Sequence, residues 1–350
     1  MTEISLCMIV KDEEMNIAQC LDSAKDLVDD IVIADTGSED RTKEIALRYT
    51  GKVYDYPWMN DFSQARNFSI SKAKNDVILV LDADERVVTC DTSEVLSEIE
   101  KNPNKIGKLL FINEFTRQGE SYQELERLGR IFSKKCYIYS GKIHEQLIPI
   151  AHTEKEFYEI PITILHSGYD GNLETRKKKA LRNICLLQEA LNTLPENPYL
   201  LYQIGRSYYM MEEYEDAKNY LGQALGYDLD IRLEYVQDLV ELYGYSLINT
   251  NQYETAMTML NLYDEFSISA DFIFLIALIH MNNGFFQEAV SEFLKATKFK
   301  NCKIKGVNDY LAYYNIGVIY ECFGDRTEAL YYYYKCKNYQ RALERMKQLK

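Results

Sequence analysis

The feature that most constrains this chain is a change of hydrophobic period near residue 170. Before that point, short apolar runs alternate with amphipathic stretches, and after it nearly the whole sequence follows the 3.6-residue period of helices. A chain of 350 residues is long enough for two domains of ordinary size. We therefore predict an α/β domain over residues 1–170, a connecting helix over 171–195 and an all-α domain over 196–350.

The first 85 residues read as four apolar runs separated by three amphipathic stretches. The predicted strands are 4–10, 30–34, 52–56 and 77–81, and the predicted helices are 13–28, 38–49 and 61–73. Such alternation is typical of a mostly parallel, Rossmann-like sheet that is covered by helices on both faces. Ligands of these sheets bind beyond the carboxyl ends of the strands, so candidate site residues are expected there.

In the second half, a small residue recurs twelve positions later in four successive segments. The pairs are Gly205 and Ala217, Gly244 and Ala256, Ala277 and Ala289, and Gly317 and Ala329. The repeats are offset by 39, 33 and 40 residues. The pattern resembles the tetratricopeptide repeat, whose period is about 34 residues, so two repeats should contain extended turns or helices. The tyrosines on the first helices either fill the core between helices or line a concave face that holds a peptide.

Composition excludes several classes of protein. A net charge of −14 is unsuited to binding a nucleic acid backbone, which requires clustered cations. No apolar run approaches the roughly 18 residues of a membrane span, and the N-terminus does not resemble a signal peptide. The eight cysteines show no CxxC spacing, so we expect reduced thiols in a cytoplasmic protein.

Two carboxylates follow the fourth apolar run. If the strand continues through them, Asp82 and Asp84 point to one side and Ala83 to the other. Two neighbouring carboxylates repel each other, and a Mg²⁺ or Mn²⁺ ion shared with a diphosphate is the simplest way to neutralise them. The alternative is a solvated acidic loop.

Two further polar residues stand at comparable places. Asp35 ends the second apolar run, ahead of a turn at Gly37, and could accept the N–H of a pyrimidine base or cap the next helix. Arg66 lies in the first turns of the helix that Asp61 should cap. We expect Arg66 to hold both Asp35 and Asp82, with an exposed surface arginine as the alternative.

Four segments occur in a recognisable order, namely MIVKDEEMNIAQCLDS, VIADTGSEDRT, DFSQARN and VLDADE. Together they resemble the N-terminal half of the family-2 glycosyltransferases with the GT-A fold. The resemblance implies that Asp35 contacts the uracil of a UDP-sugar, that Val10 and Arg66 belong to the nucleotide pocket, that Asp82 contacts the ribose and that Asp84 binds the metal at the diphosphate. The usual second acid after Asp35 is Thr36 here, which leaves the principal carboxylate in place.

The acceptor half contains RIF at 130–132, GKIHEQ at 141–146, HSGY at 166–169 and a cationic stretch over 176–182. The HE pair is not HExxH, which excludes that type of zinc protease site. These segments resemble a bacterial subgroup of family-2 enzymes with C-terminal tetratricopeptide repeats, and within it the peptide S-glycosyltransferases that modify glycocins of the sublancin type. The resemblance implies that Glu145 or His144 lies in the acceptor site and that His166 completes the metal or phosphate site.

The cationic stretch lies early in a predicted helix, where positive charge opposes the helix dipole. A diphosphate near Lys178 and Arg182 would relieve this opposition, and the alternative is a solvated basic face.

The resemblance implies an inverting, metal-dependent transfer of a hexose, with UDP-glucose as the first choice of donor, to a Cys or Ser side chain of a peptide. Glu145 is our first choice of general base, with Glu126 in reserve. The repeats would bind the acceptor, form a homodimer, or both.

Three alternatives stay open. The acceptor could be a surface polysaccharide or a lipid-linked glycan, or the protein could be a catalytically inactive scaffold. A nucleotidyltransferase also uses paired acids, but the sequence has no glycine-rich phosphate loop.

Overall fold

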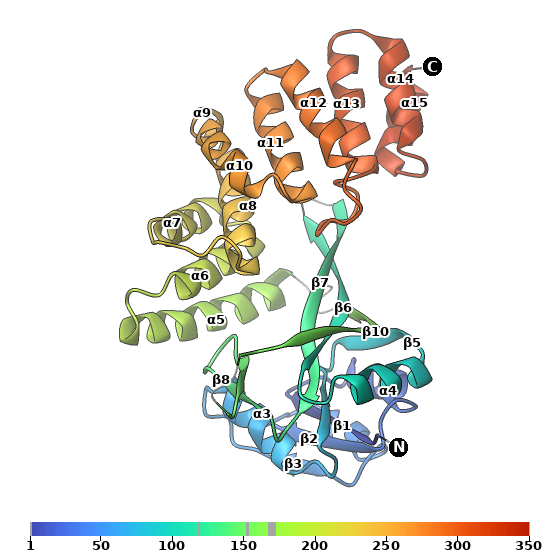
Figure 1. Ribbon diagram of the computed structural model, residues 1–350, viewed down its shortest axis with the longest axis vertical. Coiled ribbons are helices and arrows are strands. Elements are labelled where there is room, and N and C mark those ends of the chain that lie inside the picture. Colours follow the sequence, from blue (N-terminus) through green and yellow to red (C-terminus); the bar gives the residue numbers. More distant parts are fainter. Residues whose placement is uncertain (1, 118–119, 152–153, 167–172, 350) are drawn as a thin grey trace. The chain divides into compact units, whose positions relative to one another are not determined.

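The computed structural model describes residues 2–117, 120–151, 154–166 and 173–349. The chain divides into two compact units, Met1–Gly171 and Asn172–Lys350 (Figure 1). The first is built on a β-sheet and the second is helical, so the predicted fold class is confirmed.

The first unit contains an eight-stranded sheet with the order β3-β2-β1-β4-β7-β6-β10-β5 and a separate two-stranded sheet, β8-β9. The strands are β1 Ile4–Val10, β2 Asp30–Asp35, β3 Val53–Asp55, β4 Val77–Val80, β5 Glu85–Cys90, β6 Ile106–Arg117, β7 Glu120–Ser133, β8 Tyr137–Ser140, β9 Gln146–Pro149 and β10 Phe157–His166. Strands β3, β2, β1 and β4 are parallel, as the alternating sequence predicts.

The helices of this unit are α1 Ile17–Ala24, α2 Thr42–Ala46, α3 Phe62–Ser71 and α4 Thr92–Lys101. The predicted helices 13–28 and 38–49 were too long. Side chains of other segments bind the amides that precede each helix: Thr42 Oγ1, at the start of α2, accepts from the Glu13 amide, and Asp12 Oδ1 accepts from the Glu39 amide. Asp61 caps α3 as expected, by accepting from the Gln64 amide at 3.0 Å.

Alternate residues of β1 and β4 supply two separate cores. Leu6 and Leu79 belong to a cluster with α1 and α4, whereas Cys7 and Val80 belong to a cluster with α3 and the β8-β9 sheet. Both faces of the parallel half are therefore covered, which explains why its strands are apolar throughout.

The antiparallel half of the sheet was not predicted. β7 runs antiparallel to β4 and to β6, and β10 runs parallel to β6 and antiparallel to β5. This half has mixed polar and apolar strands, and it carries the C-terminal side of the candidate site.

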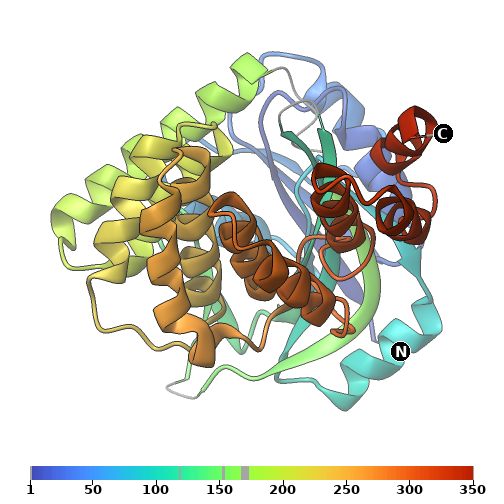
Figure 2. The ribbon, with the colours of Figure 1, turned by 90° about the horizontal axis from the view of Figure 1, so that it is seen from above.

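The second unit is a series of helices that follow one another in chain order, yellow-green to red in Figures 1 and 2. They are α5 Leu173–Thr193, α6 Pro198–Met210, α7 Tyr214–Leu225, α8 Glu234–Asn249, α9 Tyr253–Ala256, the 3₁₀ helix η1 Met257–Leu262, α10 Tyr263–Phe266, α11 Ala270–Asn282, α12 Phe286–Ala296, α13 Tyr310–Cys322, α14 Arg326–Lys335 and α15 Gln340–Leu349.

The small residues allow close packing of helices. A Cβ on Gly205 would lie 2.6 Å from Leu221 of α7, and one on Gly317 would lie 2.5 Å from Tyr333 of α14. In the second repeat, Gly244 instead approaches Leu275 of α11, and its own second helix is the single turn α9. The longer offsets correspond to the connections 226–233 and 297–309.

Three of the tyrosines on the first helices, Tyr202, Tyr209 and Tyr314, are buried, which favours the core interpretation for them.

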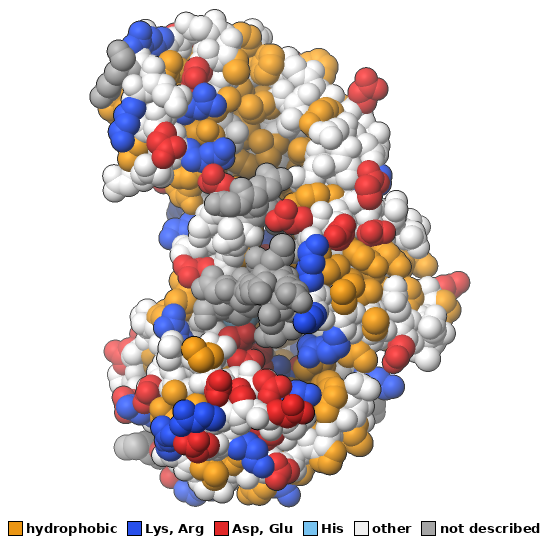
Figure 3. Space-filling view, turned by 180° about the vertical axis from the view of Figure 1, so that it is seen from behind, with side chains coloured by type: hydrophobic (Ala, Val, Ile, Leu, Met, Phe, Trp, Pro, Cys, Tyr) orange, Lys and Arg blue, Asp and Glu red, His pale blue; other side chains and the backbone are white. Residues whose placement is uncertain are grey.

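On the face drawn in Figure 3, Lys and Arg side chains are interspersed with Asp and Glu side chains. No helix in the described part of the chain combines the length and hydrophobicity that a bilayer crossing requires.

Candidate active site

The candidate site lies where β1, β2 and β4 end. Val10 and Asp35 are register partners at the ends of β1 and β2, and the Val10 carbonyl accepts from the Thr36 amide at 2.9 Å. The 81–84 segment follows β4, which pairs with β1. The parallel register thus brings three of the predicted nucleotide-binding positions to one edge of the sheet.

Asp35 is buried, with only one of its carboxylate oxygens engaged. Oδ1 accepts from the amides of Gly37 and Ser38 at 2.9 and 2.8 Å, whereas Oδ2 has no hydrogen-bond partner among the described residues. Gly37 has a φ of +105°, a conformation that favours glycine, and nothing lies within 4 Å of where a Cβ would be. A buried acceptor without a partner suits a ligand N–H group.

Arg66 is the hub of the site. From α3, its Nε donates to Glu145 Oε1 at 2.5 Å and its Nη2 donates to Asp82 Oδ1 at 3.0 Å. Its guanidinium carbon lies 5.6 Å from the centre of the Tyr139 ring, and its buried Nη1 has no partner among the described residues. The expected contact with Asp82 is present. The second acid that Arg66 binds is Glu145, whereas the paired oxygen of Asp35 is held by backbone amides.

The expectation that Asp82 and Asp84 continue a strand is wrong. β4 ends at Val80, and residues 82–85 turn so that the Glu85 amide donates to the Asp82 carbonyl at 3.1 Å. Strand alternation therefore does not set the directions of the two carboxylates, and they have separate partners, arginines for Asp82 and His166 for Asp84. Burial alone would raise the pKa of Asp82, but Arg66 and Arg130 hold it well below its usual range.

Asp84 lies beside His166, the last residue of β10. His166 Nε2 is 3.6 Å from Asp84 Oδ2, and His166 Nδ1 is 2.9 Å from Asn113 Oδ1 on β6. When Nδ1 carries the hydrogen and donates it to Asn113, the other ring nitrogen, Nε2, faces Asp84. Burial tends to lower the pKa of His166, but Asp84 raises it overall.

These residues fit a divalent cation that has few protein ligands. No group of three or more His, Cys, Asp or Glu side chains among the described residues could hold a metal. Mg²⁺ is commonly bound by one or two carboxylates together with substrate phosphates, and a ligating histidine usually donates its other N–H to an oxygen. Asp84 and the Asn113-bound His166 provide that donor set.

The loop that carries His144 and Glu145 is fixed to α3. The Phe62 amide donates to the Lys142 carbonyl at 2.8 Å, and Asn67 makes two hydrogen bonds to the backbone of Tyr139. His144 has a φ of +49° and is half-buried. Glu145 is thus placed in the same polar cluster as Asp82, as a partner of Arg66.

The remaining predicted residues lie elsewhere. Glu126 is half-buried on β7. Lys178 and Arg182 are exposed on α5 in the second unit, and their neighbour Lys177 is 3.4 Å from Glu213. Ser167, Gly168 and Tyr169 of the HSGY segment lie outside the described residues.

Sequence reasoning missed three residues of the cluster. Glu85 and Arg130 lie against Asp82, and Asn113 orients His166. Glu85 stands in the VLDADE segment and Arg130 in the RIF segment, so both had a sequence signal. Asn113 lies in an ordinary strand sequence and had none.

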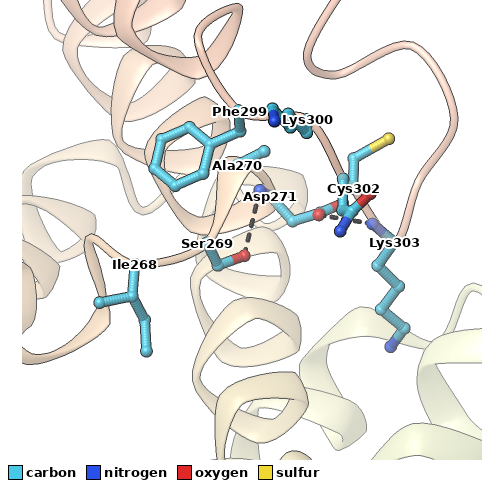
Figure 4. A pocket seen from close by; sticks show the side chains of 9 residues that line it. Ile268, Ser269, Ala270, Asp271, Phe299, Lys300, Cys302 and Lys303 are labelled. Carbon is cyan, nitrogen blue, oxygen red and sulfur yellow. Dashed lines mark hydrogen bonds between the residues drawn. The ribbon is translucent and has the colours of Figure 1, made fainter.

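A pocket of about 350 Å³ lies in the second unit (Figure 4). It is formed by Ile268, Ser269, Ala270, Asp271, Phe299, Lys300, Asn301, Cys302 and Lys303. None of the predicted site residues lines it. Asp271 accepts from the amides of Lys303 and Ile304, both at 2.7 Å, so this carboxylate holds the α12–α13 connection in place.

Comparison with known proteins finds a family match in each of the two units. Residues 5–149 match the model of glycosyl transferase family 2, and residues 198–231 match a tetratricopeptide repeat model. The first unit is a family 2 glycosyltransferase domain. The second unit contains a tetratricopeptide repeat at the place of the first of the four predicted repeats.

Two curated relatives each match a little under two thirds of this chain. A TPR repeat-containing protein of Synechococcus elongatus is 32% identical over 234 residues, which cover 64% of this chain and 57% of that protein. The SPbeta prophage-derived glycosyltransferase SunS of Bacillus subtilis is 29% identical over 244 residues, which cover 63% of this chain and 53% of SunS. The chain therefore spans a little over half the length of these relatives. The solved structure of YrrB, described as a TPR protein with an unusual peptide-binding site, aligns with a TM-score of 0.40 and 23% identity, covering 50% of this chain and 88% of YrrB.

Proposed function

We propose that this protein is an inverting, metal-dependent glycosyltransferase that moves a hexose from a UDP-sugar to a Cys or Ser side chain of a peptide. The observation that carries the proposal is the edge of the sheet where Asp35, the Arg66–Asp82 pair and the Asp84–His166 pair follow the parallel strands. Asp35, Arg66, Asp82 and Asp84 lie within residues 5–149, which match glycosyl transferase family 2, and His166 follows them in the same unit.

The donor nucleotide is assigned to the half of the site formed by β1 and β2. Asp35 Oδ2 is a buried acceptor in need of a donor, which the uracil N–H would supply. Asp82 is held by arginines, yet its side chain is 34% exposed, and it is assigned to a ribose hydroxyl.

Asp84 and His166 are assigned to a Mn²⁺ or Mg²⁺ ion at the diphosphate. When bound, such an ion stabilises negative charge on the departing phosphate oxygen. The chain's own part is to hold an oxygen and a nitrogen ligand side by side, with Asn113 fixing the histidine ring.

The transfer is a single displacement. The acceptor oxygen or sulfur forms a bond to the anomeric carbon, the bond from that carbon to the phosphate oxygen breaks, and UDP leaves with the electron pair. Glu145 is assigned to take the acceptor proton, and Glu126 is the reserve. An α-linked UDP-sugar then gives a β-linked product, and an α-linked product would exclude the scheme.

The repeats are assigned to the acceptor. A polypeptide needs a longer binding surface than a sugar nucleotide, and stacked helical repeats provide extended surfaces. Pairing of two copies through the repeats is a second proposed use of them. The participation of Lys178 and Arg182 in diphosphate binding stays a prediction.

The donor assignment is tested by titrating UDP with and without Mn²⁺ in a calorimeter, and by assaying a panel of UDP-sugars for hydrolysis or transfer. Asp84→Ala should abolish the Mn²⁺-dependent part of UDP binding and reduce turnover roughly 10²–10³-fold. Asp76→Ala is the matched control, because Asp76 precedes the same strand at its opposite end and is half-exposed. Normal turnover by Asp84→Ala would refute the metal assignment.

The acceptor assignment is tested by mass spectrometry of candidate Cys- and Ser-containing peptides after incubation with donor. A peptide gaining one hexose supports the proposal. Modification of glycans alone would favour the polysaccharide alternative, and the absence of any UDP binding would favour the inactive scaffold.

A further inference from the structure

Arg130 lies against the donor side of the cluster, although neither the sequence patterns nor the assignment above gives it a role. It lies on β7, and its side chain is only 13% exposed. Its Nη2 donates to Glu85 Oε1 at 2.8 Å and lies 3.4 Å from Asp82 Oδ2. Its guanidinium carbon lies 5.3 Å from the centre of the Phe111 ring, which supports one face of the group.

Two arginines thus hold the Asp82 carboxylate. Arg66 binds Oδ1 from α3 at 3.0 Å, and Arg130 approaches Oδ2 from β7. Glu85 completes the arrangement, because its Oε2 accepts from the Asp82 amide at 2.9 Å while its Oε1 is held by Arg130. Arg130 therefore restrains the side chain of Asp82 directly and its backbone through Glu85.

These side-chain contacts lie just beyond the point where β4 and β7 stop pairing. β4 and β7 pair through Val77–Ser133, Ile78–Phe132 and Leu79–Ile131, so Arg130 is the first residue of β7 beyond the paired region. The segment that carries Asp82 and Asp84 leaves β4 at the same point. Side-chain contacts from Arg130 take the place of the backbone hydrogen bonds that would otherwise fix this segment to β7.

We propose that Arg130 is a positioning residue for donor binding, which fixes the 82–84 turn so that Asp82 meets the nucleotide and Asp84 meets the cation in one geometry. This inference rests on the proposed function. The reason is pre-organisation, because a turn that is already held in its bound shape does not lose further conformational freedom when the donor binds.

A positioning role predicts a specific pattern in the variants. Arg130→Met removes both ionic contacts, and Arg130→Lys keeps one positive charge but cannot form the same two-sided contact. We expect the Kd for UDP in the presence of Mn²⁺ to rise about tenfold or more in Arg130→Met, and by less in Arg130→Lys. We also expect the KM for the donor to rise by a larger factor than kcat falls.

Arg127→Met is the matched control. Arg127 lies on the same strand and forms an ion pair with Glu159 at 3.2 Å, but its side chain is 39% exposed and its partner is not part of the site. This variant should bind UDP within twofold of the unmodified protein.

The outcomes separate the inference from the function on which it rests. If the unmodified protein binds neither UDP nor any UDP-sugar, the proposed function is wrong. If it binds UDP and folded Arg130→Met or Arg130→Lys binds equally tightly, only the role of Arg130 is overturned. If Arg130→Met does not fold, the folded Arg130→Lys decides: weaker UDP binding with an unchanged circular dichroism spectrum supports the role, and unchanged binding overturns it.

Discussion

Both units bury a cluster of acidic and basic side chains. The two clusters differ in whether all their buried polar atoms have hydrogen-bond partners. In the first unit, Asp35 Oδ2 and Arg66 Nη1 are buried without a partner among the described residues. In the second unit, Asp238 accepts from Tyr202 at 2.5 Å and pairs with Lys303, with Arg206 at 3.9 Å.

The acids of the second cluster are satisfied by the chain itself. Both oxygens of Asp271 accept backbone amides, and Glu241 accepts from Ser269 at 3.2 Å. Burying a polar group costs free energy unless the group has a hydrogen-bond partner. Atoms without partners in the first cluster and paired atoms in the second therefore indicate different roles. We interpret the first cluster as a binding site. We interpret the second as a structural cluster that anchors the α12–α13 connection to α8 and α11.

The largest expected effect is a loss of stability on substitution in the second cluster. Asp238→Ala should lower the free energy of unfolding by about 3–5 kcal/mol, because it leaves Lys303 in a partly buried place without its carboxylate. UDP binding by the protein that remains folded should be unchanged. Chemical denaturation measures the first quantity and calorimetry the second.

Asp230→Ala is the control for that variant, since Asp230 forms an exposed ion pair with Arg232 in the same unit. If Asp238→Ala is as stable as Asp230→Ala, the structural interpretation of the second cluster is wrong.

The next effect concerns helix packing in the repeats. Gly317→Ala should lower the free energy of unfolding by about 1–3 kcal/mol, because its Cβ would overlap Tyr333, which is fully buried. Gly51→Ala is the comparison, since nothing lies within 4 Å of its Cβ position, and it should change stability by less than about 0.5 kcal/mol. Equal denaturation midpoints for the two variants would contradict the close-packing role.

A smaller effect should appear at the first cluster. Asp35→Asn keeps the oxygen that accepts from Gly37 and Ser38 but replaces the acceptor Oδ2 with a donor. The Kd for UDP should rise about tenfold, the cost of roughly one lost hydrogen bond, while stability changes little. A stability loss with unchanged UDP binding would mean that Asp35 is a structural cap.

The last prediction concerns how stability depends on pH. Burial, together with nearby carboxylates, raises the pKa of Glu85 to about 7 and that of Glu241 to about 8, from an ordinary value near 4.5. The folded protein therefore retains protons that the unfolded chain releases. Stability should fall as pH rises from about 4.5 to 7 or 8, by at most about 1.4 kcal/mol per pH unit for each group.

Glu241→Gln and Glu85→Gln should each flatten part of this slope in urea denaturation series measured between pH 5 and 8. If neither variant changes the slope, the two glutamates are ionised in the folded protein throughout this range.

Local sequence patterns were sufficient for the parallel half of the sheet and for the close helix packing at Gly205 and Gly317. The runs 4–10, 30–34 and 77–81 became β1, β2 and β4 with shifts of one residue or less at their ends, because a continuous apolar run is a local signal. The antiparallel strands β6, β7 and β10 were missed, because their pairing partners are distant in the chain and their residues are mixed in polarity.

The sequence by itself determined which acids follow which strands and which small residues let helices approach, since both depend on spacing along the chain. Only the tertiary structure decided that Glu145 pairs with Arg66, that Arg130 and Glu85 hold Asp82, and that Asn113 orients His166. Those contacts join residues on different strands, helices and loops. Their distances follow from how the sheet and its covering layers pack, which no local pattern specifies.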